Sequence, residues 1–197
     1  LERFVQLKPL RVLASHVWGP EERLDLYTDV AASGGAVGRF AGAAEAMRFR
    51  SFMAQARRTL DALEDSYLRQ QRPRLPHLVH RIARRSPAGL LQLQPFTSLW
   101  SALGRHFRDP RLQQLFGRYS TYCGSSPFQA PATLMLIAQV EADGVWDVDG
   151  GIFQLGVALG RLATALGVDC RQATTVRRIT LRQGRVSGVQ LDDGEWL

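Results

Sequence analysis

The sequence predicts an α+β fold, in which a mixed or antiparallel sheet is interrupted by a large helical insertion. β-prone runs lie near both ends of the chain, and the long stretch between them carries apolar residues at helical spacings. No internal repeat is present to suggest a solenoid. We therefore expect two domains, one over residues 1–144 and one over residues 145–197.

The chain opens with the pattern of a β-hairpin. Residues 11–18 are rich in Val, Leu and aromatic side chains, and residues 23–27 alternate Leu with charged side chains. The tetrapeptide Gly19-Pro20-Glu21-Glu22 between them has the composition of a turn. A short helix is then expected to begin at Ser33, whose hydroxyl can cap it, and to end near Gly42.

The middle of the chain is predicted to be helical. One helix is expected from Ala43 to Gln70, ended by the prolines that follow at 73 and 76, and a second helical block over 77–124. Asp109-Pro110 places proline at an early helix position. The apolar side chains expected on the buried faces are Met47, Phe52, Leu60, Leu63, Tyr67, Leu99, Leu103, Phe107, Leu112, Leu115, Phe116 and Tyr119.

β-Signals return after Gly144. Residues 145–148 are predicted as a strand, and the following glycine pair opens a helix that runs to about Gly167. The runs 174–181 and 186–191 then form a predicted hairpin around Gln183-Gly184.

Composition excludes several classes of protein. The chain has 197 residues, 45% of them apolar, and no run approaches the roughly eighteen apolar residues of a membrane-spanning helix. Its start has neither the basic opening nor the apolar stretch of a signal peptide. Cys123 and Cys170 are too few for a disulfide framework and are expected in the core.

Both ends of the sequence are expected to be cut from a longer chain. Residue 1 is not Met, and Leu197 falls in an expected strand.

The common catalytic motifs are absent from the sequence. It contains no G-x-G-x-x-G dinucleotide loop, no P-loop and no G-x-S-x-G elbow. His77 and His80 form an H-x-x-H pair, but no carboxylate or cysteine stands nearby to complete a metal site. No metal is therefore expected.

One basic stretch lacks acidic residues. No Asp or Glu occurs from Tyr67 to Arg108, where arginine is frequent. A short helix with Arg81, Arg84 and Arg85 beside apolar residues would suit a membrane surface, its arginines among lipid headgroups. The alternative is a solvated cationic face on the protein core. Nucleic acid is not expected as a partner, because basic and aromatic residues do not interleave as in known modules.

The segment 116–151 carries a long spaced motif. It resembles the pattern R-Y-x-T-Y-x-G-S-S-P-x-x-A-P-A, followed by G-V-W and G-G, of the phytoene-desaturase type of carotenoid desaturases and dehydrogenases, a branch of the amine-oxidase-like flavoproteins. The opening hairpin and the Phe40-Ala41-Gly42 helix are more loosely similar, so the resemblance covers essentially the whole chain. The matching residues are Arg118, Tyr119, Thr121, Tyr122, Gly124, Ser125, Ser126, Pro127, Ala130, Pro131, Ala132, Gly144, Val145, Trp146, Gly150 and Gly151.

Within this family, the hydrophobic opening is most similar to the dehydrogenases that act on hydroxylated or methoxylated neurosporene. One departure is visible in the motif. Many relatives carry an aromatic and a basic residue before the glycine pair, where this chain has Asp147-Val148-Asp149. That difference concerns the substrate more than the family.

The resemblance implies both a fold and a reaction. The fold is the substrate domain of an amine-oxidase-like flavoprotein without its N-terminal Rossmann unit. The full-length protein is expected to use FAD and to dehydrogenate an acyclic carotenoid by hydride transfer to the flavin, so that no acid–base constellation is required. Because the nucleotide-binding ends are missing, we expect this chain alone to bind FAD weakly or not at all and to be inactive.

The resemblance also suggests roles for individual residues, although it identifies no catalytic residue. Gly150 and Gly151 are expected to let the backbone approach the flavin, or else to serve only a strand-to-helix turn. Val176 is expected near the adenine end of FAD, unless it is an ordinary strand valine. The aromatic residues expected to line the carotenoid tunnel, or otherwise to fill the core, are Tyr119, Tyr122, Phe128 and Trp146.

Two other functions stay open at this point. One is a non-catalytic, membrane-peripheral lipid-binding module, and the other is a related carotenoid isomerase. The expected location is the cytoplasmic side of a bacterial membrane, with peripheral contact. The sequence indicates no oligomeric state.

Overall fold

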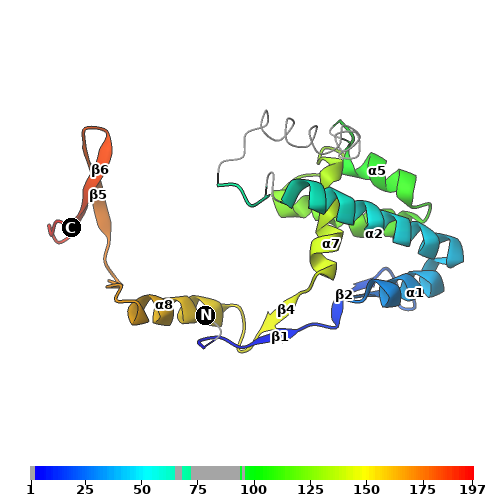
Figure 1. Cartoon of the computed structure of the whole chain (residues 1–197), viewed down its shortest axis with the longest axis horizontal. Helices are drawn as coiled ribbons and strands as arrows, with labels where there is room; N and C mark the ends of the chain where they lie inside the picture. The colour runs from blue at the N-terminus through cyan, green and yellow to red at the C-terminus, as the bar shows by residue number, and fades with distance from the viewer. Residues whose placement is uncertain (1–2, 65–67, 72–93, 95) are drawn as a thin grey trace. The chain divides into compact units, whose positions relative to one another are not determined.

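The computed structural model describes residues 3–64, 68–71, 94 and 96–197. The chain divides into two compact units, one formed by Pro9–Trp146 and the other by the residues up to Lys8 together with Asp147–Leu197. The described part combines helices with small two-stranded sheets, which is compatible with the predicted α+β class (Figure 1).

The predicted opening hairpin is confirmed. β2 (Val12–Val17) pairs antiparallel with β3 (Arg23–Tyr27). Because side chains alternate along a strand, Leu24 and Leu26 both face the core, at 2% and 4% exposure, while the charged residues between and before them face outward.

Helix α1 (Val30–Ala41) begins earlier than predicted. Asp29, not Ser33, caps it, since the Asp29 carboxylate accepts a hydrogen bond from the Ala31 amide at 2.8 Å. Ser33 is buried inside the helix, where its hydroxyl accepts from the Tyr27 amide and donates to the Tyr27 carbonyl. Gly42, with φ 94°, separates α1 from the next helix.

Helix α2 (Ala43–Leu63) ends before the predicted Gln70 and packs against α1 and α7 (Figure 1). Its buried side includes Phe49 and Phe52. The prediction that Met47 is buried is wrong, because Met47 is 65% exposed. At about 100° per residue, a position two residues before Phe49 points to the opposite side of the helix.

The remaining elements of this unit surround an aromatic centre. They are α5 (Leu99–His106), α6 (Pro110–Gly117), the 3-10 helices η2 (Arg118–Cys123) and η3 (Ala132–Met135), and α7 (Leu136–Ala142). The ring of Phe52 lies 5.1 Å from that of Phe107 and 4.6 Å from that of Phe116, between centroids. Predicted core residues confirmed as buried are Phe52, Leu60, Leu63, Leu99, Leu103, Phe107, Leu112, Leu115, Phe116 and Tyr119.

The second unit is much less buried. It contains the end of β4 (Trp146–Val148), which pairs with β1 (Leu7–Pro9), then α8 (Phe153–Ala165) and the antiparallel hairpin of β5 (Val176–Arg182) and β6 (Arg185–Leu191). The hairpin turn at Gln183 and Gly184 is confirmed, with φ 52° and 74°. Ala158 is the one α8 residue classed as buried.

Some predictions fail or fall outside the described residues. Cys123 and Cys170 are both exposed, so the core positions predicted for them are wrong. No described helix is long and apolar enough to cross a membrane. Among the same residues, no three His, Cys, Asp or Glu side chains gather as a metal site requires. Among the residues singled out in the sequence, those that lie outside the described part are Tyr67, Pro73, Pro76, His77, His80, Arg81, Arg84 and Arg85.

Candidate functional site

The motif segment is fixed to the start of α5 by its backbone. Gly124, with φ 59°, ends η2 in the left-handed conformation and turns the chain. The Leu99 amide donates to the Ala130 carbonyl at 2.8 Å, and the Trp100 amide donates to the Pro127 carbonyl at 3.0 Å. The S-P and A-P-A parts of the motif therefore place this loop over the α5 N-terminus.

Three motif side chains converge on the carboxylate of Glu141, on α7. Arg118 donates through Nη2 to Glu141 Oε1 and Oε2, at 2.9 and 3.0 Å. The Tyr119 hydroxyl donates to Oε2 at 2.9 Å, and the Tyr122 hydroxyl lies 3.4 Å from Oε1. We call these four residues the Glu141 cluster. It joins η2 to α7.

Burial sets the electrostatics of the Glu141 cluster. Tyr119 is 1% exposed, and burial, with the nearby Glu141 charge, raises its pKa well above the usual value. The Tyr119 hydroxyl therefore stays protonated and donates. The side chains of Arg118 and Glu141 are 32% and 13% exposed, so each partly shielded charge is compensated by the other.

His16 on β2 lies within electrostatic reach of this ion pair. Burial lowers its pKa, and the positive charge of Arg118 lowers it further. His16 Nε2 and Arg118 Nε are both shielded from solvent and without a hydrogen-bond partner among the described residues. A neutral imidazole suits this position, because a second cation would compete with Arg118 for Glu141.

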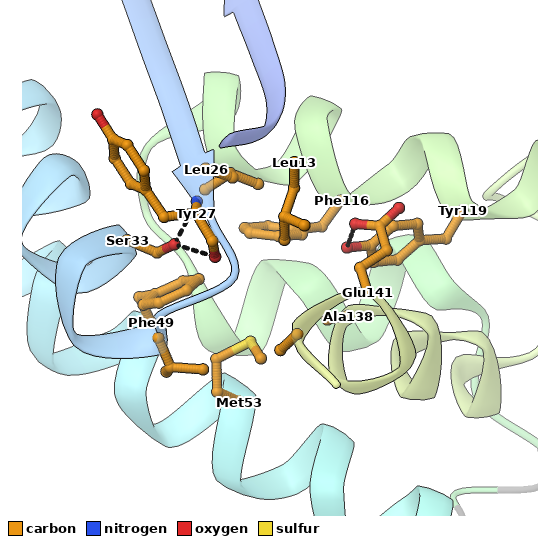
Figure 2. A pocket seen from close by; sticks show the side chains of 12 residues that line it. Leu13, Leu26, Tyr27, Ser33, Phe49, Met53, Phe116, Tyr119, Ala138 and Glu141 are labelled. Atoms are coloured by element: carbon orange, nitrogen blue, oxygen red, sulfur yellow. Dashed lines mark hydrogen bonds between the residues drawn. The ribbon is translucent and has the colours of Figure 1, made fainter. Parts of the chain in front are cut away.

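A small cavity lies beside the Glu141 cluster. Figure 2 shows Leu13, Phe116, Tyr119 and Glu141 among the side chains that line it. Its volume of about 20 Å³ has room for about one water molecule. Since sites for drug-sized ligands occupy hundreds of cubic ångströms, this cavity cannot hold a carotenoid.

The four aromatic residues predicted to line a tunnel are not gathered in one wall. Tyr119 and Tyr122 have ring centroids 6.4 Å apart, but Tyr119 is buried whereas Tyr122 is 65% exposed. Phe128 is 63% exposed and lies against Trp100, with 5.0 Å between centroids. Trp146 is 53% exposed and covers Gly144. A role in substrate binding stays a prediction for all four.

The glycine pair before α8 has a geometry that only glycine adopts easily. Gly150 and Gly151 have φ 78° and 89°, and the Gly151 amide donates to the Val148 carbonyl at 2.8 Å. A Cβ on Gly150 would lie 3.0 Å from Gln154, whereas one on Gly151 would meet nothing within 4 Å. The backbone at Gly151 is thus open to close approach.

The start of α8 adds electrostatic character to this turn. Ile152 precedes the helix, and no side chain caps its first turn. The amides of Gln154 and Leu155 donate to the carbonyls of Gly151 and Ile152, each at 3.0 Å, so these two are not available to a ligand. The glycine turn and the start of the helix can still face an anionic or planar group such as part of FAD. Val176, the first residue of β5, is 49% exposed and pairs with Leu191. Its role at the adenine end of FAD stays a prediction.

Sequence reasoning missed Glu141. Glu141 directly follows the apolar run 134–140, and Asp143 stands two residues further on, so nothing in the local sequence marks Glu141 as a shielded acid. Its partners lie between 19 and 23 residues away along the chain, a separation that no local pattern reveals.

Comparison with known proteins identifies the family. No protein-family model matches the chain. The chain is 50% identical over 196 residues to the hydroxyneurosporene desaturase of Rubrivivax gelatinosus. The aligned region covers 99% of this chain and 37% of that protein. It is 43% identical to the hydroxyneurosporene desaturase of Cereibacter sphaeroides over 100% of this chain and 40% of that protein.

A more distant match agrees with these two. The phytoene desaturase of Cercospora nicotianae is 41% identical over 111 residues, which are 55% of this chain and 18% of that protein. The chain spans less than half the length of the relatives it matches. The family predicted from the motif is confirmed, and the chain belongs to the carotenoid desaturases.

Proposed function

We propose that this chain is the substrate-handling interior of an FAD-dependent carotenoid desaturase. The whole polypeptide would dehydrogenate an acyclic carotenoid of the hydroxyneurosporene or methoxyneurosporene type. The observation that carries this proposal is the 50% identity to a hydroxyneurosporene desaturase over 196 residues. Because the chain has no G-x-G-x-x-G loop, we assign pyrophosphate binding to a part of the protein outside it.

The reaction transfers a hydride from one carbon to the cofactor and releases a proton from the neighbouring carbon to water, and a C=C bond forms between the two carbons. When bound, FAD would accept the hydride and its two electrons. In this chain, the Gly150-Gly151 turn and the start of α8 would hold part of the flavin, and Val176 would contact its adenine end. The chain's own contribution is therefore binding and orientation.

The Glu141 cluster supports a positioning role. With its hydroxyl bound to Glu141, Tyr119 holds η2 in place from inside the core. Tyr122 and Phe128, exposed at 65% and 63%, are then presented from a fixed backbone to a long apolar substrate. Holding substrate and cofactor in one geometry is what such a reaction requires of the protein.

Apolar exposure supports the proposed domain arrangement. Phe153 on α8 is 77% exposed, and the residues that flank the helix, Ile152 and Leu166, are 75% and 74% exposed. An uncovered surface of this kind usually marks an interface. We propose that the nucleotide-binding part of the full-length protein covers it, and that the protein contacts the cytoplasmic side of a bacterial membrane peripherally.

Product analysis of the longer polypeptide tests the function. It would be supplied with FAD and hydroxyneurosporene, then with methoxyneurosporene and phytoene in parallel. The proposal predicts a product two hydrogen atoms lighter, with absorption at longer wavelength. A product of unchanged mass would instead indicate an isomerase, and carotenoid binding without conversion would indicate a lipid-binding module.

A further inference from the structure

The β5–β6 hairpin carries arginines that the proposed reaction does not use. Between Thr174 and Leu191 there is no acidic residue, whereas arginine occurs at four positions. All four are exposed, and none has an ion-pair partner among the residues that the structure describes. These residues are Arg177, Arg178, Arg182 and Arg185.

The register of the hairpin collects three of them on one side. Arg182 stands directly opposite Arg185, and Arg178 is paired with Gln190. Because side chains alternate along each strand, these arginines share one face, and Ile179 and Leu181 share the other. We call Arg178, Arg182 and Arg185 the cationic face. Arg177 lies beside it in the irregularity between Val176 and Arg178.

The cationic face is electrostatically unfavourable on its own. Like charges that are directly opposite each other destabilise a strand pair. Arg182 and Arg185 stand in this arrangement. Arg171, in the same unit, shows the usual arrangement, since it contacts Asp169 at 3.2 Å and Glu195 at 2.8 Å. An external anion would supply the compensation that the hairpin lacks.

We propose that the cationic face binds the anionic headgroups of a membrane surface. The inference rests on the proposed function, because an acyclic carotenoid dissolves in the bilayer and the enzyme must reach it there. Clustered arginines beside a membrane are attracted to anionic lipid at short range. Single-stranded nucleic acid fits less well, because it needs a series of stacking platforms. In the described hairpin the aromatic ring beside these arginines is that of Trp196, which is bridged to Gln190 next to Arg178 and is 58% exposed.

Vesicle flotation tests this surface. The 197-residue chain would be mixed with phosphatidylcholine vesicles, with and without phosphatidylglycerol. Each arginine near an anionic surface changes partitioning about fivefold, so R182Q/R185Q is expected to lower binding about 25-fold. The control R50Q/R58Q removes the same charge from exposed positions on α2 and should have little effect. Circular dichroism checks that both variants fold.

The outcomes separate cleanly. Equal losses in the two double variants, or no loss in R182Q/R185Q, would overturn the proposal. Tighter binding to poly(U) RNA than to anionic vesicles, with the same arginine dependence, would also overturn it and assign the face to nucleic acid. In the longer polypeptide, R182Q/R185Q should keep turnover on detergent-dispersed carotenoid and lose it on vesicle-embedded carotenoid. Absence of turnover in both would reject the desaturase function instead, without affecting the flotation result.

Discussion

Three polar side chains of the motif donate hydrogen bonds to the carboxylate of Glu141. We expect E141Q to lower the free energy of unfolding by about 2 kcal/mol, because Arg118 would lose a charged partner in a partly shielded place. Urea unfolding measures this. The control D61N breaks the Arg57–Asp61 pair, whose side chains are 57% and 55% exposed, and should cost at most about 0.5 kcal/mol. Equal costs would contradict the assigned role.

The two tyrosines of the cluster should respond differently to loss of the hydroxyl. Y119F is expected to cost about 1–2 kcal/mol, because it removes a 2.9 Å hydrogen bond to a carboxylate inside the core. Y122F should cost almost nothing, since Tyr122 is 65% exposed and its hydroxyl lies 3.4 Å from Glu141. The same urea experiment compares them, and a larger loss in Y122F would reverse the assignment.

Two partly buried histidines should make the free energy of unfolding depend on pH. In the folded protein, burial lowers the pKa of His16 and of His106, and nearby arginines lower both further. Below about pH 6.5 the unfolded chain therefore binds protons that the folded chain does not, and the free energy of unfolding falls as pH falls. Thermal unfolding between pH 7.5 and pH 5 should show this slope. H16N/H106N should flatten it, and an unchanged slope would exclude these groups.

At the level of helices and strands, features set by neighbouring residues could be predicted, whereas features set by long-range contacts could not. Both hairpins were predictable because a few adjacent residues determine each turn. The start of α1 was not, because Asp29 and Ser33 are both good caps and only the packing of Ser33 against Tyr27 decides between them. The partnership of Glu141 with η2 depends on how α7 packs, which no local pattern contains.

Glycine substitutions test the turn before α8. We expect G151A to destabilise the protein by about 1–2 kcal/mol, because residue 151 has φ 89°, where a Cβ is strained. The control G156A lies inside α8 with nothing within 4 Å and should stabilise by about 0.5–1 kcal/mol. Chemical denaturation measures both changes. A G151A variant at least as stable as the unaltered chain would mean that the conformation of Gly151 does not matter.

The exposure of α8 predicts how readily it opens. Ala158 is the one residue of this helix classed as buried, whereas α2 contributes Phe49, Phe52 and others to the core. We expect amides of α8 to exchange with deuterium much faster than those of α2 in this chain. In the longer polypeptide they should become protected, if the nucleotide-binding part covers the helix as proposed. Equal protection in the two helices of the isolated chain would contradict this.

For the molecule as a whole, the sequence motif predicted the family, whereas the contacts between motif residues became visible only in the folded structure. The spaced residues from Arg118 to Gly151 were sufficient to predict the family. They did not predict that Arg118, Tyr119 and Tyr122 meet at one carboxylate, since the spacing of residues does not encode tertiary contacts. The described residues provide a glycine turn, to which we assign part of the proposed flavin site, and exposed apolar surface, which we propose that a further domain covers.

The absorbance spectrum of bound flavin tests the central claim most directly. The 197-residue chain and the longer polypeptide that contains it would each be saturated with FAD, desalted and scanned. The proposal predicts stoichiometric flavin on the longer polypeptide and little or none on this chain, because the chain would hold only one side of the cofactor. Stoichiometric FAD on the chain alone would show that the flavin site is complete here, and none on the longer polypeptide would reject the flavoenzyme assignment.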